Sequence, residues 1–377
     1  MDSVQQWGAV RVYLGEKSGK YPDGNQVIVQ GRDLRVAFDT PRVANRIGAD
    51  FDEVDLVILG HVHEDHMAGL HRVPQAQVQV HALDLAAAQS WEGLCAHYGY
   101  APPVLEALHA IVLADFHYHP RPDATAYEDG HVWELGAGVR IRAHHLPGHT
   151  SGHCALVVES EGLAFIGDID LTGFGPYYGD ATSSLRQFRQ SLRAVAEIEA
   201  RVWVTSHHRG VVSDRAQFLT DLQRFASRID ERSDKLLAYL AEGPQTLEQL
   251  ATRRVLYPQG FELPYVQSAE HNTVRMHLEE LAEQGRVQCD PEGHWALGPE
   301  VSRLASLHAA SFSLEEVVLP EMRALVARTK ERACGHSSCV KSGPWWLSWS
   351  VWARVPLSLL YPSWEMSRAV PSSIRLL

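Results

Sequence analysis

The sequence is poor in cysteine, lacks a secretory signal and contains no long apolar run. Its five cysteines are scattered through 377 residues without a CxxC pair, which excludes a disulfide framework. The first residues, Met1 to Gln6, have neither the basic nor the apolar segment of a secretory signal. We therefore predict that the protein is located in a reducing cytoplasm.

Basic residues are also in the minority. The formal net charge of −12 argues against general attraction to nucleic acid or to anionic lipid, although a local basic groove stays compatible with it. Residues 343–364 are apolar and rich in tryptophan, but Arg354, Pro356 and Pro362 interrupt them. Because a membrane helix needs about 20 consecutive apolar residues, no membrane span is predicted. The apolar share of 45% is sufficient for a buried core.

Histidine, in contrast, is abundant, and one segment concentrates it with aspartate. His61, His63, Asp65 and His66 follow the apolar run 54–59, which is typical of a buried strand. Side chains two residues apart in an extended segment point the same way, so His61 and His63 can hold one ion, while Asp65 and His66 face a neighbouring ion. Such ligands suit zinc, with iron and manganese as second choices. The alternative is a histidine-rich surface loop, but it does not explain why Asp65 and a fourth ligand, His66, follow at the spacing of a metal motif.

Three later segments end in residues of the same kind. They are Pro147-Gly148-His149-Thr150, Ile166-Gly167-Asp168 and Thr205-Ser206-His207. His149 is a candidate third ligand of the first ion, Asp168 a carboxylate placed to bridge both ions, and His207 a ligand of the second ion. His208 is an alternative to His207, because the last segment continues as Ser-His-His-Arg-Gly.

The order of these four motifs resembles the metallo-β-lactamase superfamily over residues 20–210. The resemblance implies an α/β fold, the αββα metallo-β-lactamase sandwich, with two metal ions at one edge between its sheets. It also implies two ligand sets that share Asp168: His61, His63 and His149 for one ion, and Asp65, His66 and His207 for the other. Asp39 corresponds to an aspartate that supports the metal loops in that family.

The expected reaction is hydrolysis. A metal-bound water has its pKa lowered to about 7, so hydroxide is available at neutral pH. Asp65 is expected to orient this hydroxide and to shuttle a proton, which makes Asp65 and Asp168 the catalytic carboxylates. Tyr177 and Tyr178 are expected to overhang the metals, where one stabilises an oxyanion or both simply pack the loop. Glu64 is expected to point away from the ligands by strand alternation and to be non-catalytic.

The chain divides into three predicted parts. Residues 1–212 form the metallo-β-lactamase domain, in which residues 84–130 are an inserted helical cap and helices are expected over 82–98 and 103–112. Residues 213–300 form a linker helix and a small winged-helix domain, because helices over 216–240, from Thr246, and over 269–284 precede a hairpin of 287–289 and 294–297. Residues 301–377 form a helix and the tryptophan-rich tail. This tail is a disordered or loosely docked segment, an interfacial anchor, or a stretch translated from a shifted reading frame, and the first and last of these are favoured.

The second part resembles the lactamase-β-like branch, which includes endoribonucleases and glyoxalase II-like thioesterases. Between residues 231 and 300 we count 12 acidic and 6 basic side chains, so nucleic-acid binding is disfavoured and packing or homodimer formation is expected. The leading hypothesis is hydrolysis of a small carbonyl ester, lactone or thioester. The alternatives are an RNA phosphodiesterase, which needs a basic cleft, and a non-catalytic protein that has kept the fold.

Overall fold

The computed structural model describes residues 4–299 and 301–303, so the predictions for the tail beyond 303 lie outside the described residues. The first sheet has the order β1-β2-β3-β4-β5-β6-β7. Its strands are β1 (Val4–Trp7), β2 (Val10–Tyr13), β3 (Gln26–Gln30), β4 (Arg35–Phe38), β5 (Leu56–Leu59), β6 (Gln77–His81) and β7 (Thr125–Tyr127). Neighbours from β1 to β4 are antiparallel, whereas β4 to β7 run parallel.

The second sheet has the order β13-β12-β11-β10-β9-β8 and is also mixed. Its strands are β8 (Val132–Glu134), β9 (Arg140–His145), β10 (Cys154–Val158), β11 (Leu163–Phe165), β12 (Val202–Val204) and β13 (Val211–Val212). Only the pair β11–β12 is parallel among the described strands of this sheet. Parallel β4 and β5 in one sheet, and parallel β11 and β12 in the other, bring four of the predicted motif segments to strand ends.

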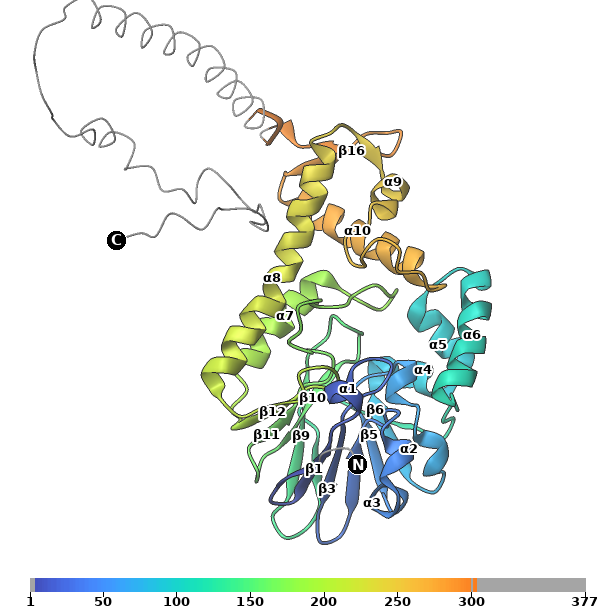
Figure 1. Cartoon of the computed structure of the whole chain (residues 1–377), viewed down its shortest axis with the longest axis vertical. Helices are drawn as coiled ribbons and strands as arrows, with labels where there is room; N and C mark the ends of the chain where they lie inside the picture. Colours follow the sequence, from blue (N-terminus) through green and yellow to red (C-terminus); the bar gives the residue numbers. More distant parts are fainter. Residues whose placement is uncertain (1–3, 300, 304–377) are drawn as a thin grey trace, which may run out of the picture. The chain divides into compact units, whose positions relative to one another are not determined.

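The two sheets pack face to face. Because side chains alternate along a strand, Val27 and Val29 of β3 meet Leu156 of β10 and Phe165 of β11 in one shared core. The opposite face of the first sheet buries Val57 and its neighbours under helices, and that of the second sheet does the same around Trp203. The result is four layers, helix, sheet, sheet and helix (Figure 1), as the sequence predicted.

The helices that precede the second sheet in the chain include those of residues 84–130, the segment predicted to be a cap. They are α1 (Glu16–Gly19), α2 (Ala44–Ile47), α3 (Ala49–Asp52), α4 (Leu85–Gln89), α5 (Trp91–Tyr98) and α6 (Pro102–Phe116), with the short 3-10 helices η1 (Glu64–His66), η2 (Leu70–Arg72) and η3 (Ala82–Asp84). The sequence predicted one helix over 82–98, which is wrong. Ser90 is extended there, and its hydroxyl caps α5 by accepting a hydrogen bond from the Gly93 amide at 3.0 Å.

The second sheet is covered by α7 (Leu185–Ala196) and by the first half of α8 (Arg215–Leu240). The second half of α8 joins a further small core with α9 (Leu247–Thr252) and α10 (Val266–Glu283). A three-stranded sheet, β14-β16-β15, completes this part, with β14 at Gln245–Thr246, β15 at Val287–Cys289 and β16 at His294–Leu297. Thr246 and Gln249 form a capping box at the start of α9, where the sequence predicted a helix to begin.

Within residues 4–299 and 301–303, no helix is both long enough and apolar enough to cross a membrane.

Candidate metal centre and its cavity

The first predicted ligand set meets where β5 and β9 end. His61, His63, His149 and Asp168 each offer one donor atom, and these atoms all lie within 4.8 Å of one another. The Nε2 atom of His149 lies 3.2 Å from His61 Nε2, 3.0 Å from His63 Nδ1 and 3.3 Å from Asp168 Oδ2. Three imidazole nitrogens and one carboxylate oxygen converging in this way can hold a divalent ion.

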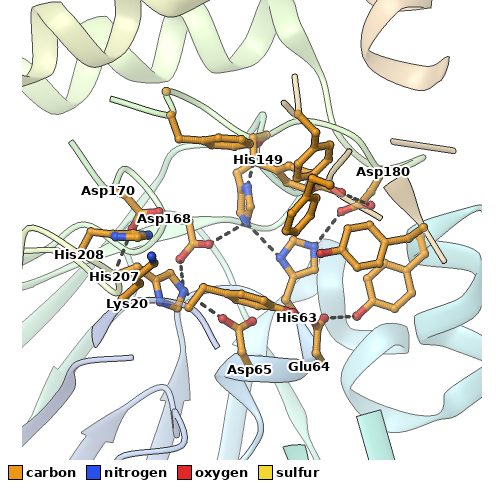
Figure 2. Close-up of a pocket in the computed structure, with 18 of the residues that line it drawn as sticks. Lys20, His63, Glu64, Asp65, His149, Asp168, Asp170, Asp180, His207 and His208 are labelled. Carbon is orange, nitrogen blue, oxygen red and sulfur yellow. Dashed lines mark hydrogen bonds and ion pairs between the residues drawn. The ribbon is translucent and has the colours of Figure 1, made fainter. Parts of the chain in front are cut away.

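The second predicted set lies beside the first and faces the other oxygen of Asp168. Asp65, His66 and His207 also converge within 4.8 Å. His207 Nε2 is 2.9 Å from Asp65 Oδ2, and Asp168 Oδ1 is 3.1 Å from His66 Nε2 and 3.6 Å from His207 Nε2. Asp168 therefore directs Oδ2 to one cluster and Oδ1 to the other (Figure 2). His207, rather than His208, belongs to the second cluster.

The donor set fits a pair of divalent ions. Asp168 Oδ1 and His66 Nε2 are buried and have no hydrogen-bond partner among the described residues. Buried polar atoms without a partner are costly, so these two atoms are explained by a cation between them. Burial alone would raise the pKa of Asp168, but the surrounding imidazoles, led by His66 and His207, lower it well below its usual range. The bridging carboxylate is therefore held in its ionised form.

Each of four ligand candidates is oriented through its second ring nitrogen. His63 Nε2 lies 2.8 Å from Asp180 Oδ2, and His66 Nδ1 lies 2.8 Å from Asp39 Oδ2. His149 Nδ1 meets the Tyr177 carbonyl at 2.9 Å, and His207 Nδ1 meets the Asp23 carbonyl at 2.9 Å. Metal-binding histidines commonly donate this N–H to a carboxylate or carbonyl, which fixes the tautomer and the ring direction.

Asp39, predicted to support the metal loops, does so through both oxygens. Its Oδ1 accepts a hydrogen bond from the Gly60 amide at 2.7 Å, while Oδ2 faces His66. Asp39 also forms a third group of potential ligands with His61 and His66. Since Asp39 occupies the Nδ1 side of His66, the geometry favours a supporting role over direct ligation.

His153 has a structural role. Its Nδ1 donates to the Leu146 carbonyl at 3.1 Å, and its Nε2 accepts a hydrogen bond from the Asp168 amide at 3.2 Å. Burial lowers the pKa of His153 to about 3, so the ring stays neutral and able to accept. Gly167 is required beside it: the residue has φ +56°, and a Cβ would lie 2.5 Å from His153 Nε2.

Sequence reasoning missed three carboxylates. Asp84 ties the loop of His61 to that of His149, because it accepts from the Val62 amide at 3.2 Å, the Thr150 hydroxyl at 2.7 Å and the Gly152 amide at 2.8 Å. Asp180 holds His63, as described above. Asp170 accepts from the His207 amide at 3.1 Å, and burial followed by the charge of Asp168 raises the pKa of Asp170 to about 7. The available sequence signal for Asp170 was its position two residues after the motif aspartate Asp168.

Two expectations about neighbouring residues are wrong. Glu64 does not follow strand alternation, because residues 64–66 form the helix η1, and its carboxylate lines the cavity next to the ligands. There it accepts hydrogen bonds from Tyr98 at 2.5 Å and Tyr21 at 3.1 Å. Tyr178 does not overhang the metals: its buried hydroxyl lies 3.0 Å from His277 Nε2 and accepts from an Arg232 nitrogen at 2.8 Å. Tyr177 does line the cavity.

A cavity of about 410 Å³ opens over both clusters. Its walls contain six tyrosines: Tyr21, Tyr98, Tyr100, Tyr177, Tyr257 and Tyr265. Phe174 and Phe261 join them, and Lys20 is the single lysine or arginine among the described lining residues. Figure 2 shows Lys20, Asp170 and His208 on one side of Asp168 and His63, Glu64 and Asp180 on the other. The cavity is therefore aromatic and acidic rather than basic.

Comparison with known proteins agrees with this geometry. The model of the Metallo-beta-lactamase superfamily matches residues 31–207. An atrochrysone carboxyl ACP thioesterase of Pseudocercospora fijiensis is 26% identical over 211 residues, which are 54% of this chain and 59% of that protein. A hydroxyacylglutathione hydrolase of Methylococcus capsulatus is 30% identical over 155 residues, 40% of this chain and 58% of that protein. The chain thus spans less than two thirds of either relative.

Solved structures extend the likeness over more of the chain. A metallo-beta-lactamase family protein from Thermus thermophilus has a TM-score of 0.55 at 25% identity, covering 73% of this chain and 93% of that one. A beta-lactamase domain protein from Burkholderia ambifaria has the same fold, with a TM-score of 0.57 at 17% identity over 78% of this chain and 94% of that one. The names of the relatives support a metal-dependent hydrolase. Family model, relatives and solved structures together support the membership of this chain in the metallo-beta-lactamase superfamily.

Proposed function

We propose that this protein is a binuclear metal-dependent hydrolase of small thioesters or related carbonyl esters. The observation that carries the proposal is the division of Asp168 between two ligand clusters, with Oδ2 facing His149 and Oδ1 facing His66. When bound there, two divalent ions supply Lewis acidity and make a nucleophile available at neutral pH. Zinc suits the imidazole-rich set, with iron or manganese as alternatives.

The residues of the chain divide the remaining work. His61, His63 and His149 direct ring nitrogens toward one point, and Asp180 and the Tyr177 carbonyl fix two of these rings in place. Asp65 directs one oxygen toward His207 and the other toward His66, so its carboxylate is aimed into the second cluster. We assign Asp65 the role of orienting the attacking water and of accepting its proton.

An RNA phosphodiesterase is the alternative, and the cavity disfavours it. A groove that binds the nucleic-acid backbone uses lysine and arginine against the phosphates. Here Lys20 is the one such side chain among the described lining residues, whereas Glu64, Asp170 and Asp180 add acidic groups outside the imidazole clusters. An uncharged carbonyl substrate fits this lining better than a polyanion.

The part formed by residues 213–300 supports the same preference. We propose that it is a winged-helix module whose third helix, α10, packs against the hydrolase rather than in a nucleic-acid groove. Glu280 of α10 accepts two hydrogen bonds from Arg189 of α7, both at 3.0 Å, and Glu283 pairs with Arg186. Two acidic side chains of α10 are thus engaged with α7, and they would repel the phosphates of a nucleic acid.

The test compares a glutathione thioester with a labelled single-stranded RNA, using purified protein, Asp168→Ala and the surface control Asp33→Ala. We expect thioester hydrolysis by the wild type and the control. Asp168→Ala should lose activity and at least one metal equivalent per chain by elemental analysis, because both clusters lose a shared ligand. Metal-dependent RNA cleavage would favour the alternative, and near-normal thioester hydrolysis by Asp168→Ala would refute the binuclear proposal.

A further inference from the structure

The aromatic wall of the cavity begins at the metal centre itself. The ring of His63 stacks on Tyr98 at 5.9 Å and 4°, and Tyr98 stacks on Tyr100 at 5.5 Å and 10°. Tyr100 then stacks on Tyr265 at 6.4 Å and 9°. These four nearly parallel rings, which we call the ring ladder, connect a ligand histidine with the residue that precedes α10.

The polar ends of the tyrosine rings are already used. Tyr98 donates to Glu64 at 2.5 Å, and Tyr100 donates to Asp180, as does Tyr177 at 3.1 Å. Both carboxylates are buried, so these hydrogen bonds hold the rings in fixed positions. Tyr98 and Tyr100 are stacked between neighbouring rings and are 3% and 7% exposed, so they offer a ligand the ring edges that line the cavity, not hydroxyl groups.

The residues before α10 extend this apolar surface to the mouth of the cavity. Tyr257 stacks on Phe261 at 5.3 Å and 11° and contacts Phe174 at 5.6 Å. Phe261 is 40% exposed and Phe174 is 42% exposed, although large apolar side chains are ordinarily buried. Exposed aromatic rings at the rim of a concave site are typical of a surface that a ligand covers.

We infer that the acyl part of the substrate is an aromatic or similarly flat apolar group that lies along the ring ladder, and that Phe261 of the C-terminal part determines this specificity. The inference rests on the proposed thioester hydrolysis. In that reaction water adds its oxygen to the acyl carbon, the carbon–sulfur bond breaks, and the thiol leaves with a proton.

The experiment uses two thioesters of N-acetylcysteamine that differ only in the acyl group, 3-phenylpropanoyl and acetyl. Because burying the ring of Phe261 contributes through its apolar area, Phe261→Ala should lower kcat/KM for the phenylpropanoyl thioester about tenfold. The acetyl thioester should change less than about twofold. The matched control is Leu219→Ala, which removes a side chain 38% exposed on α8 and outside the cavity lining.

A binding measurement separates this inference from the proposed function. Calorimetry would compare the unreactive 3-phenylpropyl and ethyl thioethers of N-acetylcysteamine with the wild type and Phe261→Ala. If neither thioester is hydrolysed but the phenylpropyl thioether binds and Phe261→Ala weakens it, the proposed reaction is wrong and the aromatic site stands. If both thioesters are hydrolysed equally well by the wild type, or if Phe261→Ala affects both to the same extent, the inference is overturned while the reaction stands. Failure of both thioethers to bind, with no hydrolysis, refutes both.

Discussion

Asp180 lies outside the four sequence motifs, yet it provides a sharp test of how the first cluster is held. One of its oxygens faces His63 Nε2 at 2.8 Å, and the other accepts hydrogen bonds from Tyr100 and from Tyr177 at 3.1 Å. Burial opposes the charge of this carboxylate, but the hydrogen bond and charge of His63 lower the pKa of Asp180 overall. The group is therefore an ionised partner that orients His63 and increases its basicity.

Asp180→Asn keeps the size of the side chain and removes its charge. The amide oxygen can still accept from His63, while the two phenol hydroxyls can turn to accept from the amide nitrogen. Loss of such a supporting carboxylate typically weakens metal binding 10–100-fold, which corresponds to about 1.4–2.8 kcal/mol. We therefore expect a comparable fall in zinc affinity and a smaller loss of activity at saturating zinc.

The assay is competition for zinc between the protein and a chromogenic chelator, read together with thioester hydrolysis at limiting and saturating zinc. Asp33→Asn serves as the matched control, since Asp33 is an exposed aspartate paired with Arg32. Circular dichroism spectra of both variants should match that of the wild type. Zinc affinity for Asp180→Asn within about twofold of the control would refute the argument that the carboxylate of Asp180 positions His63.

Two further predictions concern stability. Burial, followed by the charges of Arg232 and Arg189, lowers the pKa of His277 to about 3, so its stabilising contribution is complete above about pH 6.5 and falls as pH decreases. The free energy of unfolding falls by about 1.4 kcal/mol per pH unit in this range. Measured by urea unfolding, it should fall about 2 kcal/mol less for His277→Gln than for the wild type between pH 7 and pH 5. An equal fall for both proteins would contradict this account. Trp203→Ala should lower the free energy of unfolding by about 3–5 kcal/mol, because the buried indole stacks on Phe218 at 4.4 Å; a loss below about 1 kcal/mol would show that α8 does not depend on this contact.

The strands and the metal motifs could be predicted because each is a local pattern. The mostly apolar run 54–59 predicts β5. The two-residue spacing of His61 and His63 predicts side chains on the same side of an extended segment. The hairpin of β15 and β16 has its predicted bounds, because Pro291-Glu292-Gly293 is a strong turn signal. In each case the residues that decide the structure are adjacent in the chain.

The predictions that failed depend on contacts between distant segments. Residues 82–98 have a continuous helical composition, but Ser90 ends α4 and caps α5, so one helix became two. Tyr178 was predicted near the metals from its distance in sequence to Asp168. Its direction is instead decided by His277 and Arg232, 99 and 54 positions later in the chain. No local pattern around Tyr178 contains those partners.

The ring ladder shows the same limit at the centre of the proposed function. Tyr98 and Tyr100 lie in residues 84–130, the segment predicted to be an insertion, and Tyr265 precedes α10. Each residue alone is an ordinary buried tyrosine by sequence, since aromatic side chains fill most cores. Their rings become parallel across these separate segments, where Glu64 and Asp180, both next to ligand histidines in space, accept hydrogen bonds from the hydroxyls of Tyr98 and Tyr100. The motifs therefore predict the hydrolytic chemistry, whereas the acyl specificity that we propose depends on contacts between three separate parts of the chain.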